Sequence, residues 1–520
     1  MSRPAGPDDH SSYDGHDDFR RAARERAARQ NRVRVPSVLG AHGALVTSLR
    51  TGEICVNDRL DEGDIGARFS VSRNAVRSAL RLLATEGVVS RSPRAGTVVT
   101  SGMTEIPIDN GLAWNVGTDP ERQVVVLDQR WVASSPVIRR YLRTTATRVH
   151  ASEILDLHVG NPILLYTRYT LEEGRDRPLV PRSDDGRFEE VFARAYGSPL
   201  ARIDSWIEAG SADDRTAAQL RTPAGTPLIV KSRVLWSGDG VPREFSITHY
   251  PAARVALSTA TDGAGPDDDP VVESVAVPEV RTGGVDAAPD LLRTSAANLR
   301  VELRAAIREG IVRPGDRLVE DELARSFGAG RSTVRQALTH LAHEGTVTRT
   351  AGSTLAGPIA AYRLNSGVPH RETETGRHRS RHLTSVTIPA APFVAHLLAP
   401  PDGRVVLDEF LSVRDDGHAT LYLRYTTPSA EPRPLVVGRR DEFREGFRRA
   451  YGRPPGRVVT VVHAVTADAD AARRLRVAPD SILLLSERVL FDADGAVREF
   501  SHSYRAAAHA CLATRTVLPT

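Results

Sequence analysis

Lysine, cysteine and long apolar runs are scarce in this chain, and each scarcity argues against a class of protein. Lys231 is the single lysine among 520 residues, and it lies in a β-branched run, so a nucleotide-binding P-loop and a pyridoxal-phosphate Schiff base both lack their lysine. Cys55 and Cys511 lie far apart and in no zinc-binding spacing, which argues against a disulfide framework and a structural zinc. The longest apolar stretches, such as Ile482–Leu485, fall far short of the roughly 20 residues that span a bilayer. We expect a cytoplasmic protein that makes no membrane contact and holds no metal or cofactor.

Aromatic residues are also few, at 5%, whereas 26% of the residues are charged. Lysine and arginine together number 69 and the acidic residues 65, which gives a net charge of +4. This excess is too small to indicate a nucleic-acid partner by itself, so the distribution of the arginines must decide. The length of the chain predicts about three or four domains.

A long internal repeat organises the sequence. Residues 59–91 align without a gap to residues 317–349, and they share leucine, arginine, glutamate and glycine positions at an offset of 258. Further on, residues 195–197 and 450–452 are both Ala-Tyr-Gly, and Arg233 matches Arg488 at an offset of 255. Two large units in tandem explain this pattern better than a solenoid of short repeats.

The first part of each unit is predicted to be a winged helix-turn-helix. In the first unit, helices are expected over Ala44–Arg50 and Asp64–Phe69. Ser72 can cap a third helix, which stops at Gly87 and is followed by a small β-hairpin over residues 88–99.

The third helix carries arginines on one face. Arg73, Arg77 and Arg81 recur at i, i+4 and i+8, opposite the apolar face. Such a face fits the major groove, where guanidinium groups pair with guanine O6 and N7 or with phosphates. The alternative is a solvated helix face beside acidic neighbours, and Glu86 is the only acid that the sequence places nearby. We therefore favour binding in the groove.

These segments resemble the DNA-binding domain of GntR-family bacterial transcription regulators. The resemblance is carried by residues 59–60, 70–91 and 93–97, and again by residues 314–324 and 331–345. It implies double-stranded operator DNA as a partner, with the wing glycines allowing the hairpin tip to approach the backbone. The residues that it places at the DNA are Ser72, Arg73, Asn74, Arg77, Arg81, Arg94, Gly96, Thr97, Arg331, Ser332, Thr333, Arg335 and Gly352.

The chain departs from the family pattern at different places in the two copies. Asp61-Glu62 and Val319-Glu320 stand where the family has Pro-Ser, and acid there would repel phosphate. In the second copy, Gly330 removes the helix cap, and the shorter wing has no basic residue matching Arg94. Each head is therefore altered in its own way, and one of them could bind DNA more tightly than the other.

The rest of each unit is predicted to be an α+β domain. In the first unit, we expect a helical stretch over Ala151–Leu157, a strand over Pro162–Tyr166 and a helix over Phe188–Tyr196. A hairpin then joins residues 227–235 to residues 241–250, and residues 481–491 and 497–504 form the same hairpin in the second unit.

These segments are similar to the UTRA effector-binding domain of the HutC branch of the GntR family. That domain binds a small molecule, with anions among the candidates, and also forms the dimer. The effector-binding positions that the resemblance implies are Arg168, Arg233, Glu244, Ser246, Tyr250, Arg488, Glu499, Ser501 and Tyr504. Alternatively, Arg233 and Glu244 form a simple cross-strand ion pair. The second copy has Glu409 near the place of Arg168, which would make it less welcoming to an anion.

The predicted fold is α+β, with two winged helix-turn-helix domains alternating with two UTRA-like (chorismate-lyase-like) effector domains. Gly, Pro and acidic residues over 261–290 indicate a flexible linker, and residues 361–382 a second loose stretch. His370, His378 and His382 in that stretch are interpreted as part of a basic loop, because no cysteine or ordered carboxylate completes a metal set. The predicted boundaries are a tail at 1–35, heads at 36–102 and 291–358, and effector domains at 115–260 and 383–518. Basic residues 19–29 within the tail form either a helical arm that meets phosphates or a disordered segment.

The functional hypothesis is a transcription regulator, expected to be a repressor, under the control of a small-molecule effector. One chain would act as a covalent pseudo-dimer with its two heads in neighbouring major grooves, although pairing of two chains is also open. Two alternatives remain: a ligand-sensing adaptor whose heads no longer bind specific DNA, and a residual lyase. We expect no enzymatic activity and assign no catalytic residue, because no nucleophile elbow and no paired carboxylates stand out.

Overall fold

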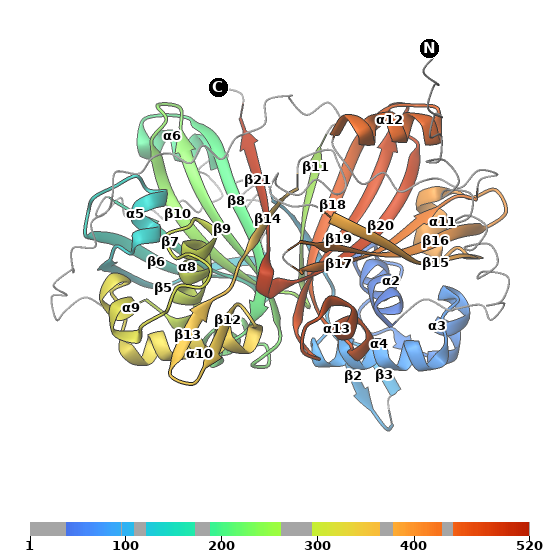
Figure 1. Ribbon diagram of the computed structural model, residues 1–520, viewed down its shortest axis with the longest axis horizontal. Helices are drawn as coiled ribbons and strands as arrows, with labels where there is room; N and C mark the ends of the chain where they lie inside the picture. The colour runs from blue at the N-terminus through green and yellow to red at the C-terminus, as the bar shows by residue number, and fades with distance from the viewer. Residues whose placement is uncertain are drawn as a thin grey trace, which may run out of the picture.

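The computed structural model describes residues 38–94, 96–108, 121–171, 188–261, 294–364, 378–415, 417–428 and 440–518. Figure 1 shows two halves side by side, each a large twisted sheet with a small helical head at its lower edge. No helix in these ranges is long and apolar enough to cross a membrane.

Head 1 is built from residues 38–99 and has the predicted helix-turn-helix with a wing. It contains α2 (Val38–Arg50), α3 (Glu62–Phe69) and α4 (Arg73–Thr85), with the three-stranded sheet of β1 (Arg59–Leu60), β2 (Val89–Ser92) and β3 (Gly96–Val99). The Ser72 hydroxyl accepts the backbone N–H of Ala75 at 3.2 Å, which confirms it as the cap of α4. The apolar positions of α4 are buried against the other helices.

Head 2, residues 296–356, repeats this arrangement. It contains α8 (Ala296–Arg308), α9 (Glu320–Ser326), α10 (Arg331–Glu344) and the hairpin of β12 (Val347–Thr350) with β13 (Ser353–Ala356). Gly330 precedes α10 and supplies no side-chain bond to the helix N-terminus, as its lack of a side chain predicts.

Two eight-stranded sheets form the bodies of the two halves. The first large sheet has the order β14-β21-β8-β9-β10-β7-β6-β5, and the second has the order β15-β16-β17-β20-β19-β18-β11-β4. The strands of the first sheet are β5 (Arg122–Ala133), β6 (Arg148–His158), β7 (Asn161–Thr170), β8 (Leu200–Ser211), β9 (Pro227–Ser237), β10 (Pro242–Pro251), β14 (Ala360–Arg363) and β21 (Ala510–Val517). Those of the second are β4 (Thr104–Pro107), β11 (Val255–Thr261), β15 (His378–Pro389), β16 (Arg404–Arg414), β17 (Ala419–Thr426), β18 (Pro455–Thr466), β19 (Ile482–Asp492) and β20 (Val497–Ala506).

Short helices lie around these sheets and confirm an α+β architecture. They are α5 (Pro136–Tyr141), α6 (Phe188–Tyr196), α7 (Asp214–Leu220), α11 (Pro392–Leu398), α12 (Arg440–Tyr451), α13 (Ala469–Leu475) and the 3-10 turn η1 (Ala507–His509). The predicted helix over residues 188–196 and both predicted hairpins are present.

The two units exchange strands. β11, which ends the first unit, leaves its own sheet and pairs with β18 of the second, so that Leu257 lies opposite Val462. β21, which ends the second unit, pairs with β8 of the first, so that Leu512 lies opposite Ile207. The apolar faces around these strands share one buried core. Each large sheet is therefore completed by the other unit, and burying this surface holds the halves together.

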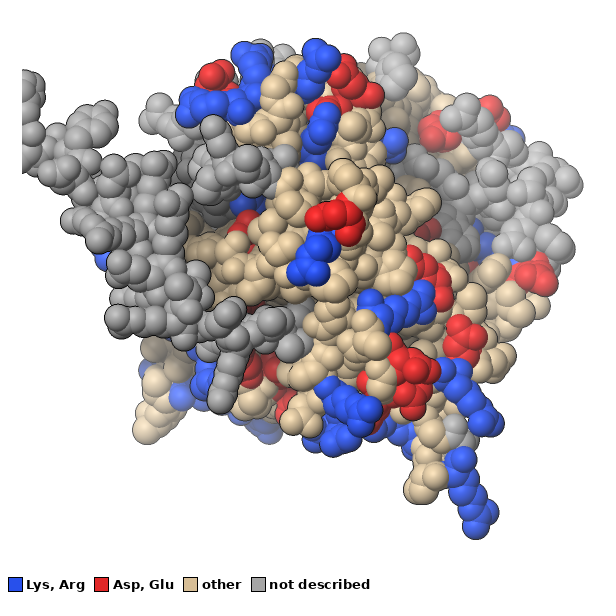
Figure 2. Space-filling model, turned by 90° about the vertical axis from the view of Figure 1, so that its right-hand side faces the viewer, with Lys and Arg blue, Asp and Glu red and all other residues tan. Residues whose placement is uncertain are grey.

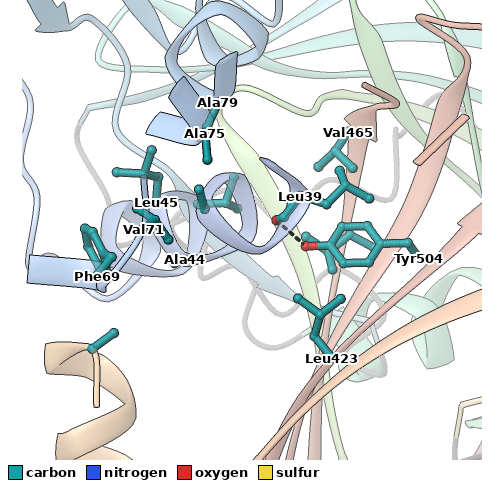
Figure 3. Close-up of a cluster of buried hydrophobic side chains, with 14 of the residues drawn as sticks. Leu39, Ala44, Leu45, Phe69, Val71, Ala75, Ala79, Leu423, Val465 and Tyr504 are labelled. Carbon is teal, nitrogen blue, oxygen red and sulfur yellow. Dashed lines mark hydrogen bonds between the residues drawn. The ribbon is translucent and has the colours of Figure 1, made fainter. Parts of the chain in front are cut away.

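The heads are exchanged as well. Head 1 shares a buried core with the second large sheet, where the Tyr504 hydroxyl donates to the Leu39 carbonyl at 2.9 Å (Figure 3). Head 2 shares a core with the first large sheet, where Asn298 Nδ2 donates to Thr167 Oγ1 at 3.0 Å. Each head thus packs on the effector domain of the other unit.

Two predictions of local structure are wrong. Ala151–Leu157 is not helical but belongs to β6, because hydrogen bonds to β5 on one side and β7 on the other outweigh its helical spacing. The loose stretch predicted over residues 361–382 begins in β14 and ends in β15. Residues 1–35 with their basic segment, residues 262–293 of the linker, and His370 lie outside the described residues.

Candidate DNA interface and effector site

The third helices of the heads, α4 and α10, lie along the same lower edge of the molecule in Figure 1, with the β2–β3 wing projecting beyond them. The predicted arginines are exposed there: the side chain of Arg77 is 52% exposed, that of Arg335 66% and that of Arg331 72%. Ser72, Arg73, Asn74, Arg81 and Ser332 are exposed too, and Thr333 is half-buried. The structure therefore presents both helices to a common partner on one face.

In head 1 the start of α4 and the wing enclose a hollow of about 650 Å³. The residues that line it come from the end of β1 and the start of α3, from α4 and from the β2–β3 hairpin: Leu60, Asp61, Glu62, Gly63, Arg73, Arg77, Arg91, Ser92, Pro93, Gly96 and Thr97. Predicted DNA residues from the helix and from the wing meet in this hollow.

Carboxylates from the preceding helix hold the arginines of both third helices. Arg77 pairs with Glu62 at 2.8 Å, and Arg335 pairs with Glu320 at 2.9 Å. Arg331 lies 2.6 Å from Asp321. The bond from Arg77 lowers the pKa of Glu62. These pairs place acid beside the arginine face.

The prediction that Glu86 is the nearby acid is therefore wrong. Sequence distance hid Glu62, which lies fifteen residues before Arg77, whereas Glu86 is buried and faces the interior. The acid at Asp61 has a local role, because its carboxylate caps α3 by accepting the N–H groups of Gly63 and Asp64 at 2.7 and 3.0 Å.

The wings differ between the heads. Gly96 and Gly352 have φ values of +75° and +88°, which only glycine adopts without strain, so each allows its hairpin to turn tightly. Arg94 is exposed at the tip in head 1, whereas Thr97 is largely buried behind it. Figure 2 shows basic side chains along the lower edge of the right-hand half and on the projecting wing.

A buried carboxylate at the C-terminal end of each third helix fastens the head to the large sheet of the other unit. Glu344 accepts hydrogen bonds from Arg300 at 3.0 Å and from the backbone N–H of Ser211, at the end of β8, at 3.1 Å. Glu86 lies 2.8 Å from His42 Nε2 and accepts the N–H of Thr466, at the end of β18, at 2.8 Å. This role was not predicted from the sequence, although both glutamates lie at matched repeat positions.

The predicted effector residues of the first unit form a row across the first large sheet. Arg168 on β7 lies opposite Ser246 on β10, which lies opposite Arg233 on β9. Ser152 on β6 and Ser205 on β8 extend the row at its two ends. We call these five residues the first polar row. All are at least 95% buried.

Several polar atoms of the first polar row have no partner among the described residues. They are the hydroxyls of Ser152, Ser205 and Ser246 and the Nε of Arg168. Buried polar groups are normally hydrogen-bonded, so a row of such atoms is typical of a binding site.

Glu244 and Tyr250 lie on the same face as the row. Arg233 Nη2 is 3.3 Å from Glu244 Oε1, so the cross-strand ion pair is present, and the Tyr166 hydroxyl also donates to that carboxylate. Burial raises the pKa of Tyr250 to about 12, which keeps its hydroxyl protonated.

The second large sheet carries an equivalent row, which we call the second polar row: Asp408, Arg424, Ser501, Arg488 and Thr460. Here Arg424 on β17 takes the place of Arg168, so the expectation that Glu409 lies there is wrong. The sequence did contain the signal, because Arg-Tyr-Thr occurs at both 168–170 and 424–426. Glu499 lies on the same face and is 3.8 Å from Arg424.

Tyr504 is not brought together with the other predicted effector residues. It lies on the opposite face of β20, is fully buried, and bonds head 1 through Leu39 (Figure 3). Since Ser501 matches Ser246, the residue that matches Tyr250 is Arg505, one position beyond Tyr504.

Comparison with known proteins finds the same two modules twice. The family model of bacterial regulatory proteins, gntR family, matches residues 40–99 and 296–355, and the UTRA domain model matches residues 123–256 and 374–509. The HTH-type transcriptional repressor PhnF of Mycolicibacterium smegmatis is 25% identical over 210 residues, which cover 38% of this chain and 81% of that protein.

Solved structures of such regulators also align with this chain. The crystal structure of PhnF from Mycobacterium smegmatis matches 42% of this chain and 96% of its own, with 23% identity and a TM-score of 0.28. That of the possible transcriptional regulator YydK from Bacillus subtilis matches 41% and 93%, with 16% identity and a TM-score of 0.24.

The UTRA matches alone cover more than half of the 520 residues, and each follows a head that matches the gntR model. The chain belongs to the gntR family of bacterial regulatory proteins with a UTRA domain, duplicated in tandem, and is a ligand-responsive DNA-binding transcription regulator.

Proposed function

We propose that this chain acts alone as a covalent pseudo-dimer. Its two heads and two effector domains have the boundaries that the sequence predicts. The reciprocal exchange of β11 and β21 carries the proposal, because the strands at one edge of each large sheet come from the other unit. In a single chain this exchange needs no second molecule. It also turns α4 and α10 toward one edge, as two adjacent major grooves on one face of DNA require (Figure 1).

In this proposal Arg73, Arg77 and Arg81 of head 1 enter one groove, while Arg331 and Arg335 of head 2 enter the next. The hydroxyls of Ser332 and Thr333, together with Asn74, add polar contacts that differ between the heads. The two halves of the operator would therefore differ in sequence, because each head presents its own side chains to the bases.

The pairs that Glu62 and Glu320 make with the arginines are compatible with DNA binding. They are exposed, and exposed ion pairs contribute little net stability. Guanine or phosphate oxygens replace the carboxylate when the helix enters the groove. Sequences that offer no bidentate partner leave the pair intact, which favours specific sites over random DNA.

Repression is the proposed outcome, supported by the likeness to a protein named as a transcriptional repressor. The proposed effector is a small anion, supported by the arginines and unpartnered hydroxyls of the first polar row. Effector binding would change the spacing of the heads and release the operator.

The pseudo-dimer is tested by the stoichiometry of the DNA complex. Sedimentation equilibrium of the full chain should give one chain per particle, and one chain should bind one operator fragment and protect two half-sites about 34 Å apart. A stable particle of two chains that needs both to protect one operator would overturn the proposal.

The assignment of the helices to the groove is tested with arginine variants. Arg77→Ala and Arg335→Ala should each weaken operator binding roughly ten- to a hundredfold if the arginine is bidentate to guanine. Arg453→Ala is the matched control, because Arg453 is an exposed arginine paired with Asp494 just after α12. An equal loss on random and operator DNA would assign a phosphate role, and no loss would favour an adaptor that no longer reads DNA.

A further inference from the structure

The two polar rows differ at one position that matters for charge. Ser152 in the first row is replaced by Asp408 in the second, at the strand position directly opposite the first arginine. Asp408 Oδ2 accepts a hydrogen bond from Arg424 Nη2 at 2.8 Å. Arg168 makes no ion pair with a carboxylate in the part of the chain that the structure describes. The second row thus carries its own anion where the first carries a hydroxyl.

Burial makes this difference strong. Asp408 is 9% exposed and Arg424 6% exposed, so water screens their attraction only weakly. Although burial itself opposes ionisation, His382 and Arg424 lower the pKa of Asp408 to about 2, so its carboxylate stays charged at neutral pH. Glu499 adds a second carboxylate at 3.8 Å from the same guanidinium. An incoming anion would meet an arginine that two carboxylates already surround.

Two other arginines lie close together in the second large sheet: Arg488 in the second polar row and Arg505 beyond it. The Arg505 guanidinium lies over the rings of Tyr362 at 4.8 Å and Tyr422 at 5.8 Å, and it donates to Ser503. Burial and the nearby Arg505 lower the pKa of Arg488 to about 10.

We propose that the first polar row alone binds an oxyanion, and that Asp408 permanently occupies the equivalent place in the second row. The chain then takes one effector, although it has two UTRA domains. The ligand class is a small phosphate-like or carboxylate oxyanion, because the guanidinium groups can only donate and the hydroxyl groups between them can donate as well. The inference rests on the proposed effector response but not on the proposed DNA geometry.

An anion bound in the first polar row would affect head 2 before head 1. Arg168 points to one face of β7, and its neighbours Thr167 and Tyr169 point to the other. Asn298 Nδ2, at the start of α8, donates to Thr167 Oγ1 at 3.0 Å and to the Tyr169 hydroxyl at 3.3 Å. A shift of β7 toward a bound anion therefore reaches head 2 through two hydrogen bonds, while head 1 packs on the other sheet.

The test is a calorimetric titration of the full chain with inorganic phosphate, at constant ionic strength maintained with chloride. The expected stoichiometry is one phosphate per chain. Arg168→Gln should raise the Kd roughly tenfold or more, because it removes a charge-assisted bond, whereas Arg424→Gln should leave the Kd within roughly twofold.

Reciprocal exchanges sharpen the result. Asp408→Ser should raise the stoichiometry to two, and Ser152→Asp should abolish binding. Asp408→Asn is the second variant if Asp408→Ser unfolds, and thermal unfolding checks each protein. Two phosphates bound by the wild type, or no change in stoichiometry with either Asp408 variant, would overturn the self-occupied second row.

The absence of binding to the wild type would overturn the first row as an oxyanion site. Operator binding by the anion-free chain is measured separately. If the chain binds operator DNA but no phosphate, the oxyanion site is refuted and the proposed DNA geometry stands. If it binds phosphate but no operator DNA, the DNA geometry is refuted and the oxyanion site stands.

Discussion

The buried carboxylates that fasten the heads allow a paired comparison within one molecule. Glu344 faces Arg300, which is buried and whose guanidinium is always charged. Glu86 instead faces His42, and an imidazole side chain can exist without a charge. We predict that the isosteric change Glu344→Gln destabilises head 2 far more than Glu86→Gln destabilises head 1.

The magnitudes follow from the partners left behind. With Glu344→Gln, the amide oxygen still accepts from Arg300 and from the N–H of Ser211, but the negative charge that pairs with the buried Arg300 guanidinium is lost. That loss costs about 3 kcal/mol, at the lower end for a broken buried pair. With Glu86→Gln, the amide oxygen still accepts the N–H of Thr466, and the amide N–H₂ can donate to a neutral His42. The expected cost is below about 1 kcal/mol.

The assay must resolve the two heads, because a chain with several domains does not unfold in one step. Amide hydrogen exchange provides this resolution: exchange in α10 should accelerate strongly in the Glu344 variant, while α4 in the Glu86 variant should stay close to the wild type. Equal acceleration in the two heads would refute the reasoning that the permanence of the arginine charge decides the cost.

Three further perturbations test other contacts. Glu62→Gln should strengthen DNA binding and steepen its dependence on salt concentration by up to about one counterion, because it frees Arg77, as anisotropy titrations at several salt concentrations would reveal. Burial raises the pKa of Glu302 to about 7, so the folded chain holds a proton there that the unfolded chain releases. The free energy of unfolding therefore falls as the pH rises from about 4.5 to 7. Glu302→Gln should remove that fall, which unfolding measured from pH 5 to 8 would show. Tyr504→Phe should weaken the packing of head 1 on the second large sheet by about 1 kcal/mol, because the hydrogen bond to the Leu39 carbonyl is lost. Amide hydrogen exchange in α2 should become faster, and phosphate binding should not change.

Patterns that are local in sequence predicted most of the fold. The apolar spacing of α4, its cap at Ser72 and the turn at Gly87 are set by neighbouring residues, so the heads could be predicted. The hairpins followed for the same reason. Residues 151–157 failed because their helical spacing is also compatible with a strand buried on both faces, and only the partners β5 and β7 decide between the two.

The exchange of strands and heads could not be predicted from the sequence. The units are duplicates, so β11 and β21 carry similar apolar patterns and fit either sheet. The choice between the two pairings depends on contacts between residues more than two hundred positions apart, and local propensity carries no information about such contacts. Arg168 and Ser246, which were predicted from the family pattern, do lie together in the first polar row. Arg424 and Asp408 were missed because a shift of one residue in the alignment moves a side chain to the other face of its strand.

Fusion of the two units into one chain allows equivalent positions in the two units to carry different residues. In a symmetric dimer of identical chains, one substitution appears at both equivalent sites, so a carboxylate that neutralises one anion site neutralises the other as well. Here Ser152 and Asp408 occupy equivalent positions with different chemistry, and His42 and Arg300 do the same beside equivalent glutamates. These differences are buried, where each is tied to its own partners and costs stability if exchanged alone. Under the proposed asymmetry, the duplicated chain keeps one binding row and uses the other as a structural support whose anion site is already filled, which a homodimer built from one sequence cannot do.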